Sequence, residues 1–134
     1  MWFSINEMQA KLQDPHNLPI LFNCNSNGFG GFECYFNENR LYYRILPPMS
    51  YSAPTVESNG VLIGEFTPNK WHFLGLEHDK PFLARAQLIA VVNDKQAVNF
   101  PMDYPKFDKH SKLNMVSICN NYIGQLTTFM LFRE

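Results

Sequence analysis

Apolar and polar positions alternate with a period of two along most of the chain, and the 3.6-residue spacing of an amphipathic helix is nearly absent. The clearest example runs from Phe32 to Phe36, and the alternation resumes over Leu41–Ile45 after a polar link. This pattern predicts a hairpin of two half-buried strands. Tyr35 and Tyr42 fall out of phase with the core-facing positions of the hairpin, so we expect them to expose some aromatic surface.

Further apolar segments, bounded by glycine, proline and asparagine, predict strands on both sides of this hairpin. Asn59-Gly60 favours a type I′ turn within Val56–Leu62, and Asn93-Asp94 reverses the chain after a buried run. One short helix is predicted over Asn6–Gln13, and Pro15 would end it. The other expected strands are Trp2–Ile5, Trp71–His78, Leu88–Val92, Gln96–Val98, Met115–Cys119 and Gln125–Phe132.

Many short strands without alternating helices predict a single all-β domain over residues 1–134, an antiparallel β-sandwich of jelly-roll type. A chain of 134 residues, 46% of them hydrophobic, has room for one core. Both ends of the sequence fall in or beside predicted strands, so we expect a domain cut from a longer polypeptide. Truncating Trp71 to alanine is expected to unfold most of it. The residues predicted in the core or at its edge include Trp71, Leu74, Leu76, Ile89, Val91, Ile118, Phe129 and Leu131.

Charge and cysteine content argue against several classes of partner. A net charge of −1 gives no general field that would attract nucleic acid. The basic residues are scattered and no apolar run approaches the length of a membrane span, so we expect no direct membrane insertion. Cys24, Cys34 and Cys119 form no CxxC pair and are interpreted as reduced thiols. Together with the absence of an Asn-x-Ser/Thr acceptor, they favour the cytoplasm.

No residue pattern predicts catalysis. His72 and His78 share a strand face but lie roughly 20 Å apart, too far to share a metal ion. Glu77 and Asp79 have the alternating spacing of glycosidase carboxylates, but a Lys-Pro turn follows them at once. The glycines of Gly28–Gly31 are not followed by the Lys-Ser/Thr of a phosphate loop and indicate a strand entry or a bulge. We therefore expect no enzyme, no metal and no cofactor.

The order of signals in residues 60–134 resembles the concanavalin A-like domain of the BEACH-family proteins, large scaffolds that include neurobeachin and the lysosomal-trafficking regulator. Residues 1–59 match only through the opening strand and the first hairpin. The combination and spacing of the matching elements carry the resemblance, since each alone is common in related sandwiches. These elements are Trp71–His78, Leu88–Asp94, Tyr104-Pro105, Ile123-Gly124-Gln125 and Leu131–Glu134.

The resemblance implies a non-catalytic interaction module in a cytosolic scaffold of vesicle trafficking, lysosomal or autophagy pathways, upstream of a PH-like domain, a BEACH domain and WD40 repeats. Its partners would be other proteins or neighbouring domains of the same chain, and it would lie near membranes only through the full-length protein. Two alternatives stay open: a lectin-like domain that binds oligosaccharide, and a degenerate glycosidase-like sandwich. The sequence lacks the alternating Asp and Asn run of calcium-dependent legume lectins, which favours interaction over lectin.

The candidate interaction surface is expected on the two longest irregular segments, Pro47–Val56 and Phe100–Lys112. Both are rich in proline and tyrosine, and the second adds basic residues of the kind that rim interfaces. If these segments are only connections, the contact surface is expected on the sheet face around Tyr35 and Tyr42. The candidate residues are Tyr51, Tyr104, Lys106, Lys109, His110, Tyr35 and Tyr42.

Overall fold

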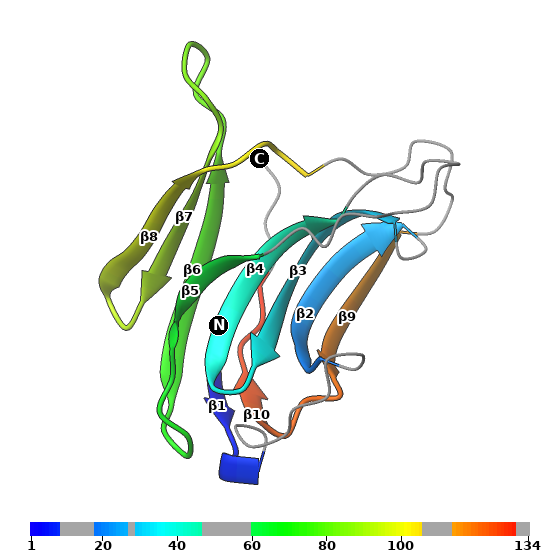
Figure 1. Ribbon diagram of the computed structural model, residues 1–134, viewed down its shortest axis with the longest axis vertical. Helices are drawn as coiled ribbons and strands as arrows, with labels where there is room; N and C mark the ends of the chain where they lie inside the picture. Colours follow the sequence, from blue (N-terminus) through cyan, green and yellow to red (C-terminus); the bar gives the residue numbers. More distant parts are fainter. Residues whose placement is uncertain (9–17, 27–28, 47–59, 106–113, 131–134) are drawn as a thin grey trace.

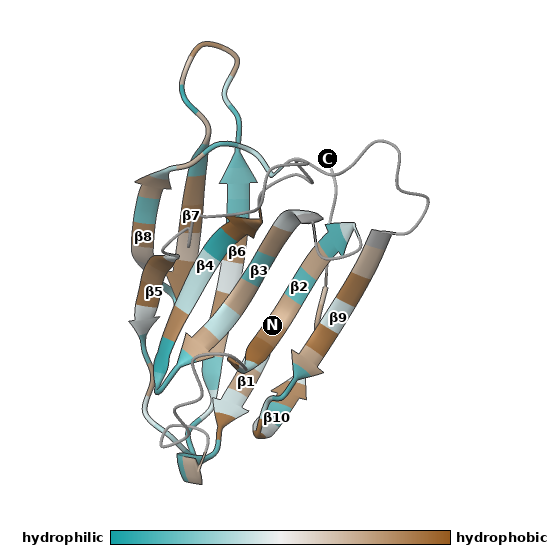
Figure 2. Cartoon of the chain, turned by 45° about the vertical axis from the view of Figure 1, so that its right-hand side comes forward, coloured by the Kyte–Doolittle hydropathy of each residue, from teal (hydrophilic) through white to brown (hydrophobic). Residues whose placement is uncertain are grey.

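The computed structural model describes residues 1–8, 18–26, 29–46, 60–105 and 114–130, and every structural statement below concerns these residues. They form two antiparallel sheets of five strands each, packed face to face (Figures 1 and 2). Sheet A has the strand order β10-β1-β6-β7-β8, and sheet B has the order β5-β4-β3-β2-β9. The strands are β1 Trp2–Ile5, β2 Ile20–Ser26, β3 Phe29–Asn37, β4 Arg40–Leu46, β5 Val61–Glu65, β6 His72–Asp79, β7 Gln87–Val92, β8 Lys95–Pro101, β9 Asn114–Asn120 and β10 Gly124–Thr127.

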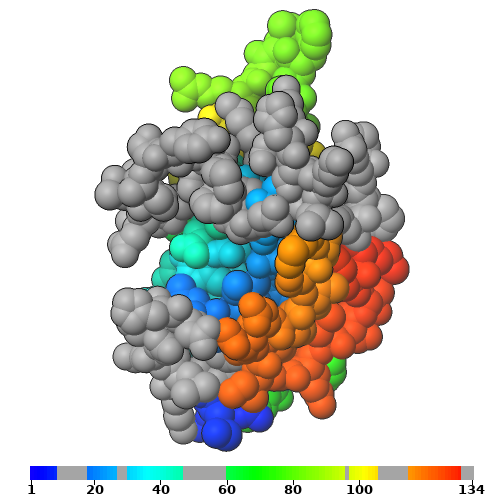
Figure 3. All heavy atoms as spheres, turned by 90° about the vertical axis from the view of Figure 1, so that its right-hand side faces the viewer, coloured from blue at the N-terminus to red at the C-terminus, as the bar shows by residue number. Residues whose placement is uncertain are grey.

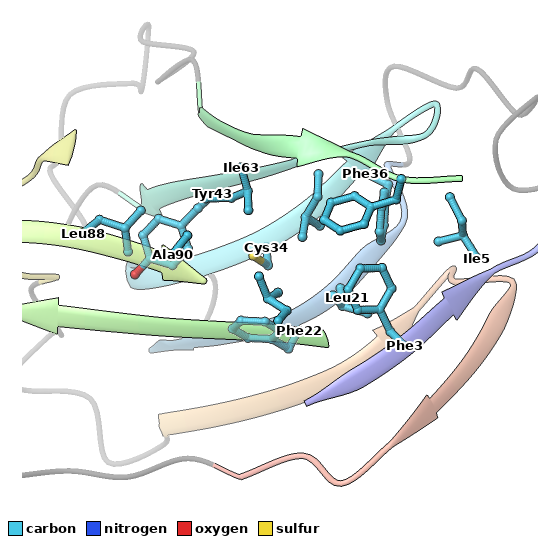
Figure 4. Close-up of a cluster of buried hydrophobic side chains, with 13 residues drawn as sticks. Phe3, Ile5, Leu21, Phe22, Cys34, Phe36, Tyr43, Ile63, Leu88 and Ala90 are labelled. Atoms are coloured by element: carbon cyan, nitrogen blue, oxygen red, sulfur yellow. The ribbon is translucent and has the colours of Figure 1, made fainter. Parts of the chain in front are cut away.

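The hydrophobic core fills the space between the two sheets (Figure 4). Phe3, on β1 of sheet A, is fully buried, and its ring lies 5.8 Å from that of Phe36 on sheet B and 5.0 Å from that of Phe66. Apolar side chains from both sheets thus meet in one layer, and the prediction of an all-β sandwich is confirmed. The buried apolar residues are Phe3, Ile5, Leu74, Leu88 and Ala90 from sheet A, with Leu21, Phe22, Cys34, Phe36, Leu41, Tyr43, Ile63 and Phe66.

The first predicted hairpin is confirmed as β3 and β4. Their register pairs Phe36 with Leu41 and Asn37 with Arg40 across a two-residue turn. Alternate residues of both strands point into the core, as the period of two requires. The inward set of this hairpin consists of the buried Cys34, Phe36, Leu41 and Tyr43 with the partly buried Phe32 and Ile45.

The hairpin of β7 and β8 is also confirmed, with Val92 paired to Lys95 across Asn93-Asp94. Asn93 has a φ of 47° and Asp94 a φ of 64°. Positive φ at both central residues is the conformation of a type I′ turn, which asparagine and aspartate tolerate better than most residues. A glycine is therefore not needed at this turn.

The prediction that Trp71 lies in the core is wrong. Its side chain is 48% exposed, and the next residue, His72, takes the inward position. Both nitrogens of the buried His72 ring have hydrogen-bond partners. His72 Nε2 lies 3.0 Å from the Thr67 carbonyl oxygen, and His72 Nδ1 lies 3.3 Å from Asn93 Nδ2. A neutral ring that donates from Nε2 and accepts at Nδ1 satisfies both contacts.

Three other residues that were predicted in the core or at its edge lie outside the buried core. On β7 the fully buried residues are Leu88 and Ala90, whereas Ile89 and Val91 occupy the opposite, partly exposed face. Ile118 is 42% exposed because β9 is an edge strand. Leu74 is buried as predicted, Leu76 and Phe129 pack against the core, and Leu131 lies outside the described residues.

Strand β2, a central strand of sheet B, was not predicted from the sequence. It pairs with β3 on one side and β9 on the other. Its alternation is masked by Asn23 and Asn25, which are buried, and by register shifts beside Ile20 and Asn25. Gly31, with a φ of 105°, allows the close approach to β3, because a Cβ there would lie 2.0 Å from the Cys24 carbonyl oxygen. A bulge at this end of β3 agrees with the prediction for the glycine run.

Two predicted elements fall largely outside the described residues. Residues 7 and 8 take a helical conformation, but the rest of the helix expected over Asn6–Gln13 is not described. For the hairpin expected over Val56–Leu62, the description begins at Gly60, and β5 then pairs with β4. Strand β10 ends at Thr127 and is shorter than expected. Among the described residues, no helix has the length and apolar character needed to cross a membrane.

Candidate functional site

The predicted interaction residues divide into three groups. Tyr51, Lys106, Lys109 and His110 lie outside the described residues. Tyr104 is about half exposed beside the end of sheet A, whereas Tyr35 and Tyr42 lie on the outer face of sheet B. The structure therefore does not bring the described candidates together into one surface.

Tyr35 and Tyr42 stack on each other with ring centres 5.5 Å apart and planes 15° from parallel. The Arg44 guanidinium carbon lies 4.7 Å from the centre of the Tyr35 ring, and Arg44 forms an ion pair with the buried Glu33. Burial raises the pKa of Tyr35, although the charge of Arg44 acts in the opposite direction. Tyr35 is only 8% exposed, so the prediction that it offers open aromatic surface is wrong. The cluster packs these side chains together on the outer face of sheet B, where Tyr42 is only partly buried, and a contact surface there stays a prediction.

Tyr104 belongs to a second aromatic cluster, centred on His78. The ring of His78 lies 5.5 Å from that of Tyr43 and 5.5 Å from that of Tyr104. Both ring nitrogens of His78 are buried and have no hydrogen-bond partner in the described part of the chain. Burial lowers the pKa of His78, because an apolar surrounding disfavours the charged imidazolium.

This burial predicts a dependence of stability on pH. The unfolded chain takes up a proton on His78 at about pH 6.5, before the folded chain does, so the contribution of the neutral ring is present above that pH. It is lost as the pH falls from there toward the lower pKa of the folded state. We expect His78→Phe to lose less stability than the parent over this range, measured by urea unfolding at several pH values. Equal acid sensitivity of parent and variant would contradict the prediction.

A third and more exposed group of aromatic residues lies on the outer face of sheet A. Trp2 is paired with Phe73 across β1 and β6, and their rings make an edge contact at 5.4 Å between centres. Because Phe3 and His72 point inward, Trp2, Trp71 and Phe73 all point away from the core. We name these three residues the aromatic face. Trp2 and Trp71 are each about half exposed.

A groove of about 390 Å³ lies beside Trp71 and is largely polar. Its walls come from the turn before β6, from the end of β1 and from the start of β10, and they include Ser4 and three residues with amide side chains, Asn6, Asn69 and Gln125. The Asn6 side-chain oxygen accepts a 2.8 Å hydrogen bond from the Met8 backbone N–H. We name it the amide groove. Its complete lining is Ser4, Ile5, Asn6, Asn69, Trp71, Ile123, Gly124 and Gln125.

Local sequence explains how the amide groove is built. The turn that precedes β6 places Asn69 at a positive φ of 59°, which asparagine tolerates. On the other wall Gly124 lets β10 lie close to β1, since a Cβ there would come within 2.0 Å of the Ser4 carbonyl oxygen. The Tyr122 hydroxyl donates a 2.7 Å hydrogen bond to the same oxygen. These contacts hold the β10 wall against β1, and the Asn69 backbone N–H, which donates a 2.7 Å hydrogen bond to the Ile5 carbonyl oxygen, holds the wall that comes from the turn.

The residues of the aromatic face and of the amide groove are suited to contact a ligand by stacking and by hydrogen bonds. A half-exposed indole offers a flat apolar surface for stacking, and amides supply paired donors and acceptors. Sequence reasoning missed these residues because Trp71 was assigned to the core. The signal that could have found them is parity: Trp2 and Ser4 alternate with the apolar Phe3 and Ile5.

The described residues contain no group of three or more His, Cys, Asp and Glu side chains that could hold a metal ion. Glu77 is exposed, and Asp79 accepts a 3.2 Å hydrogen bond from Gln87 Nε2. All three cysteines are free, and burial raises the pKa of the Cys34 thiol well above its usual range. Cys34 is fully buried in the core and packs there as a small apolar residue.

Comparison of the chain with protein-family models, with curated proteins and with solved structures found no match in any of the three. The function is therefore inferred from the fold and from the chemistry of the surface.

Proposed function

We propose that this chain is a non-catalytic binding domain that contacts its ligand through the outer face of sheet A. The observation that carries the proposal is the pair of half-exposed tryptophans, Trp2 and Trp71: Trp2 is paired with Phe73 across β1 and β6, and Trp71 directly precedes β6. Tryptophan in a rigid, exposed position is costly in water and is enriched at the centres of binding surfaces.

A protein surface is the ligand that the aromatic face supports best. At Gly75 a Cβ would lie 3.6 Å from the Phe73 ring and 3.8 Å from Val91, so the Phe73 ring lies along β6 over Gly75, and Val91 of β7 is beside it on the same face. Trp2, Phe73 and Val91 therefore form an apolar strip across β1, β6 and β7. Interfaces place such a strip at their centre and polar residues around it.

We further propose that the sandwich is a concanavalin A-like jelly roll and that the domain serves a cytosolic BEACH-type scaffold in vesicle trafficking, lysosomal or autophagy pathways. The topology agrees with this, because the chain crosses between the sheets four times, after β1, β5, β8 and β9. The resemblance of residues 60–134, carried by β6, β7 and the Ile123-Gly124-Gln125 step, is the support for the scaffold. Neighbouring domains of the same chain are then partners as well.

A lectin-like function is the second candidate, and the amide groove favours it. Sugars stack on indole rings through their C–H faces and exchange hydrogen bonds with amides, and both groups meet at Trp71. An oligosaccharide would contact Trp71, Asn69 and Gln125, whereas a protein partner would depend on Trp2 and Phe73. The two candidate functions thus depend on different residues of sheet A.

Alanine variants separate these candidates. We expect Trp2→Ala with Phe73→Ala to weaken binding to immobilised neighbouring domains or a purified partner by about 30-fold or more, the effect of losing a central interface anchor. Trp71→Ala with Gln125→Ala should instead abolish any signal on a glycan array, read with and without calcium. Tyr42→Ala, on sheet B, is the control in both assays. A partner that binds the Trp2 and Phe73 variant as well as the parent would contradict the main proposal.

The degenerate glycosidase-like alternative has its own readout. Glu77 and Asp79 occupy alternate positions on β6, on the face that carries Phe73. A screen of glycosidase substrates is expected to show no turnover above background. Reproducible turnover that Glu77→Gln abolishes would replace the binding proposal with a hydrolase.

A further inference from the structure

The hairpin of β6 and β7 ends in a crest, residues 80–86, that projects beyond both sheets (Figures 1 and 3). The last strand pair below it joins Asp79 to Gln87. Phe82 and Leu83 form the turn at its top and are 99% and 93% exposed. Their side chains therefore make almost no contact with the rest of the described chain.

This exposure sets the crest apart from other apolar residues on the surface. The remaining large hydrophobic side chains classed as exposed among the described residues reach at most 66%, at Met8. Isolated exposure of that kind is ordinary in folded proteins. Two adjacent large apolar side chains at a projecting turn are not, because each stays fully in contact with water.

Two cations flank the apolar pair. Lys80 precedes Pro81-Phe82-Leu83, Arg85 follows it, and both are exposed. In Figure 2 the top of the crest has apolar colour while hydrophilic residues lie along its arms. The nearest acid, Asp79, lies below the crest and accepts its hydrogen bond from Gln87. The crest itself, residues 80–86, contains no acidic residue.

We propose that the crest binds the surface of an anionic lipid bilayer, with Phe82 and Leu83 in the interfacial region and Lys80 and Arg85 at the headgroups. An apolar tip with flanking cations matches the two layers of such a surface, since the acyl boundary accepts apolar side chains and the anionic headgroups attract lysine and arginine. A bilayer needs no preformed pocket. A stable protein interface, in contrast, requires far more area than two side chains supply.

The sequence alone led to the opposite expectation, because the basic residues are scattered along the chain. The hairpin changes this, since the antiparallel pairing of β6 and β7 brings Lys80 and Arg85 to the two sides of one turn. Only two cations and two apolar side chains take part. The anchor is therefore weak and reversible, because neither the apolar pair nor the cations would hold the domain on a bilayer alone.

The proposal is compatible with binding on sheet A. Strand β6 runs from the amide groove at Trp71 toward the crest, about 25 Å away at 3.3 Å per residue. An interfacial element enters the bilayer by only about 5–10 Å. The groove therefore remains open to solvent when the crest is bound, so a failure of one proposal does not decide the other.

Cosedimentation of the 134-residue chain with vesicles of phosphatidylcholine, with and without phosphatidylserine, tests the anchor. We expect binding to the phosphatidylserine vesicles that weakens as salt is raised. Phe82→Ser with Leu83→Ser should lower the partition coefficient about tenfold or more, and Lys80→Glu with Arg85→Glu should remove the preference for phosphatidylserine. Met8→Ser with Met130→Ser, two exposed apolar residues elsewhere, is the matched control and should bind as the parent does.

Insertion has a separate readout in Phe82→Trp. Its added fluorescence, taken as the difference from the parent, should shift to the blue and be quenched by brominated lipids. Absence of vesicle binding by the parent would overturn the proposal, and so would equal binding of the parent and the crest serine variant. Capture of a protein through the crest by a chain that ignores vesicles would assign the crest to a protein partner instead. All variants should keep the melting temperature of the parent, because the changed residues are exposed.

Discussion

Phe3→Ala is expected to remove a large part of the stability of the domain. The Phe3 ring is fully buried where β1 meets sheet B, in edge contact with Phe66 and 5.8 Å from the rings of Phe36 and His72. Replacing a buried phenylalanine by alanine costs about 3–5 kcal/mol through lost transfer energy and the cavity left behind. A domain of this size has a total stability of about 5–15 kcal/mol. Urea unfolding followed by circular dichroism measures the loss.

Trp71→Ala is the matched control, because it removes a larger ring from a half-exposed position just before β6, the central strand of the same sheet. We expect it to cost about 1 kcal/mol or less, as for surface substitutions away from the core. If Trp71→Ala destabilised the domain as much as Phe3→Ala, the outward orientation of Trp71 would be wrong. The aromatic face would then lose one of its three members.

Arg44→Met is expected to destabilise the fold by about 2–3 kcal/mol. Glu33 is 5% exposed on the outer face of sheet B, and Arg44 is its ion-pair partner. Removing the guanidinium leaves a carboxylate in a buried position without that partner, a change that costs about 3–5 kcal/mol when both groups are fully buried. The expected cost is smaller than this because water still reaches about a third of the Arg44 side chain.

A double-mutant cycle tests the cause of this effect. Glu33→Gln alone should cost about 1 kcal/mol, and Glu33→Gln with Arg44→Met should be more stable than Arg44→Met alone, since the stranded charge is gone. Arg40→Met serves as the control, because its pair with Glu65 is 3.6 Å long and more than half exposed; it should change stability by less than about 0.5 kcal/mol. Simple addition of the two single effects would contradict the buried-charge explanation.

Local alternation was sufficient to predict most strands and two of the turns. The hairpins around Glu38-Asn39 and Asn93-Asp94 follow from residues that are neighbours in sequence, because period-two runs flank a short polar link in each case. Asn93 and Asp94 also tolerate the positive φ that they adopt, whereas the φ of 57° at Glu38 does not follow from its residue type. Strand β2 escaped prediction because its outward Asn23 and Asn25 are buried by contacts beyond the strand itself. In the sequence, a polar residue on a covered face of a strand cannot be distinguished from a polar residue in a loop.

The sequence by itself therefore determined that the chain is built from antiparallel strands, and where most of them lie. It did not determine which face of a strand meets the core when both faces carry apolar residues. On β6 and the residue before it, Trp71 and Phe73 compete with Leu74, and on β7 Ile89 competes with Leu88. A shift of one residue exchanges the two faces completely, so the choice depends on the sheet that packs against the strand. The same dependence on distant partners governed the binding surfaces: only the pairing of β1 with β6 placed Trp2 beside Phe73, and only the hairpin of β6 and β7 brought Lys80 and Arg85 to one turn.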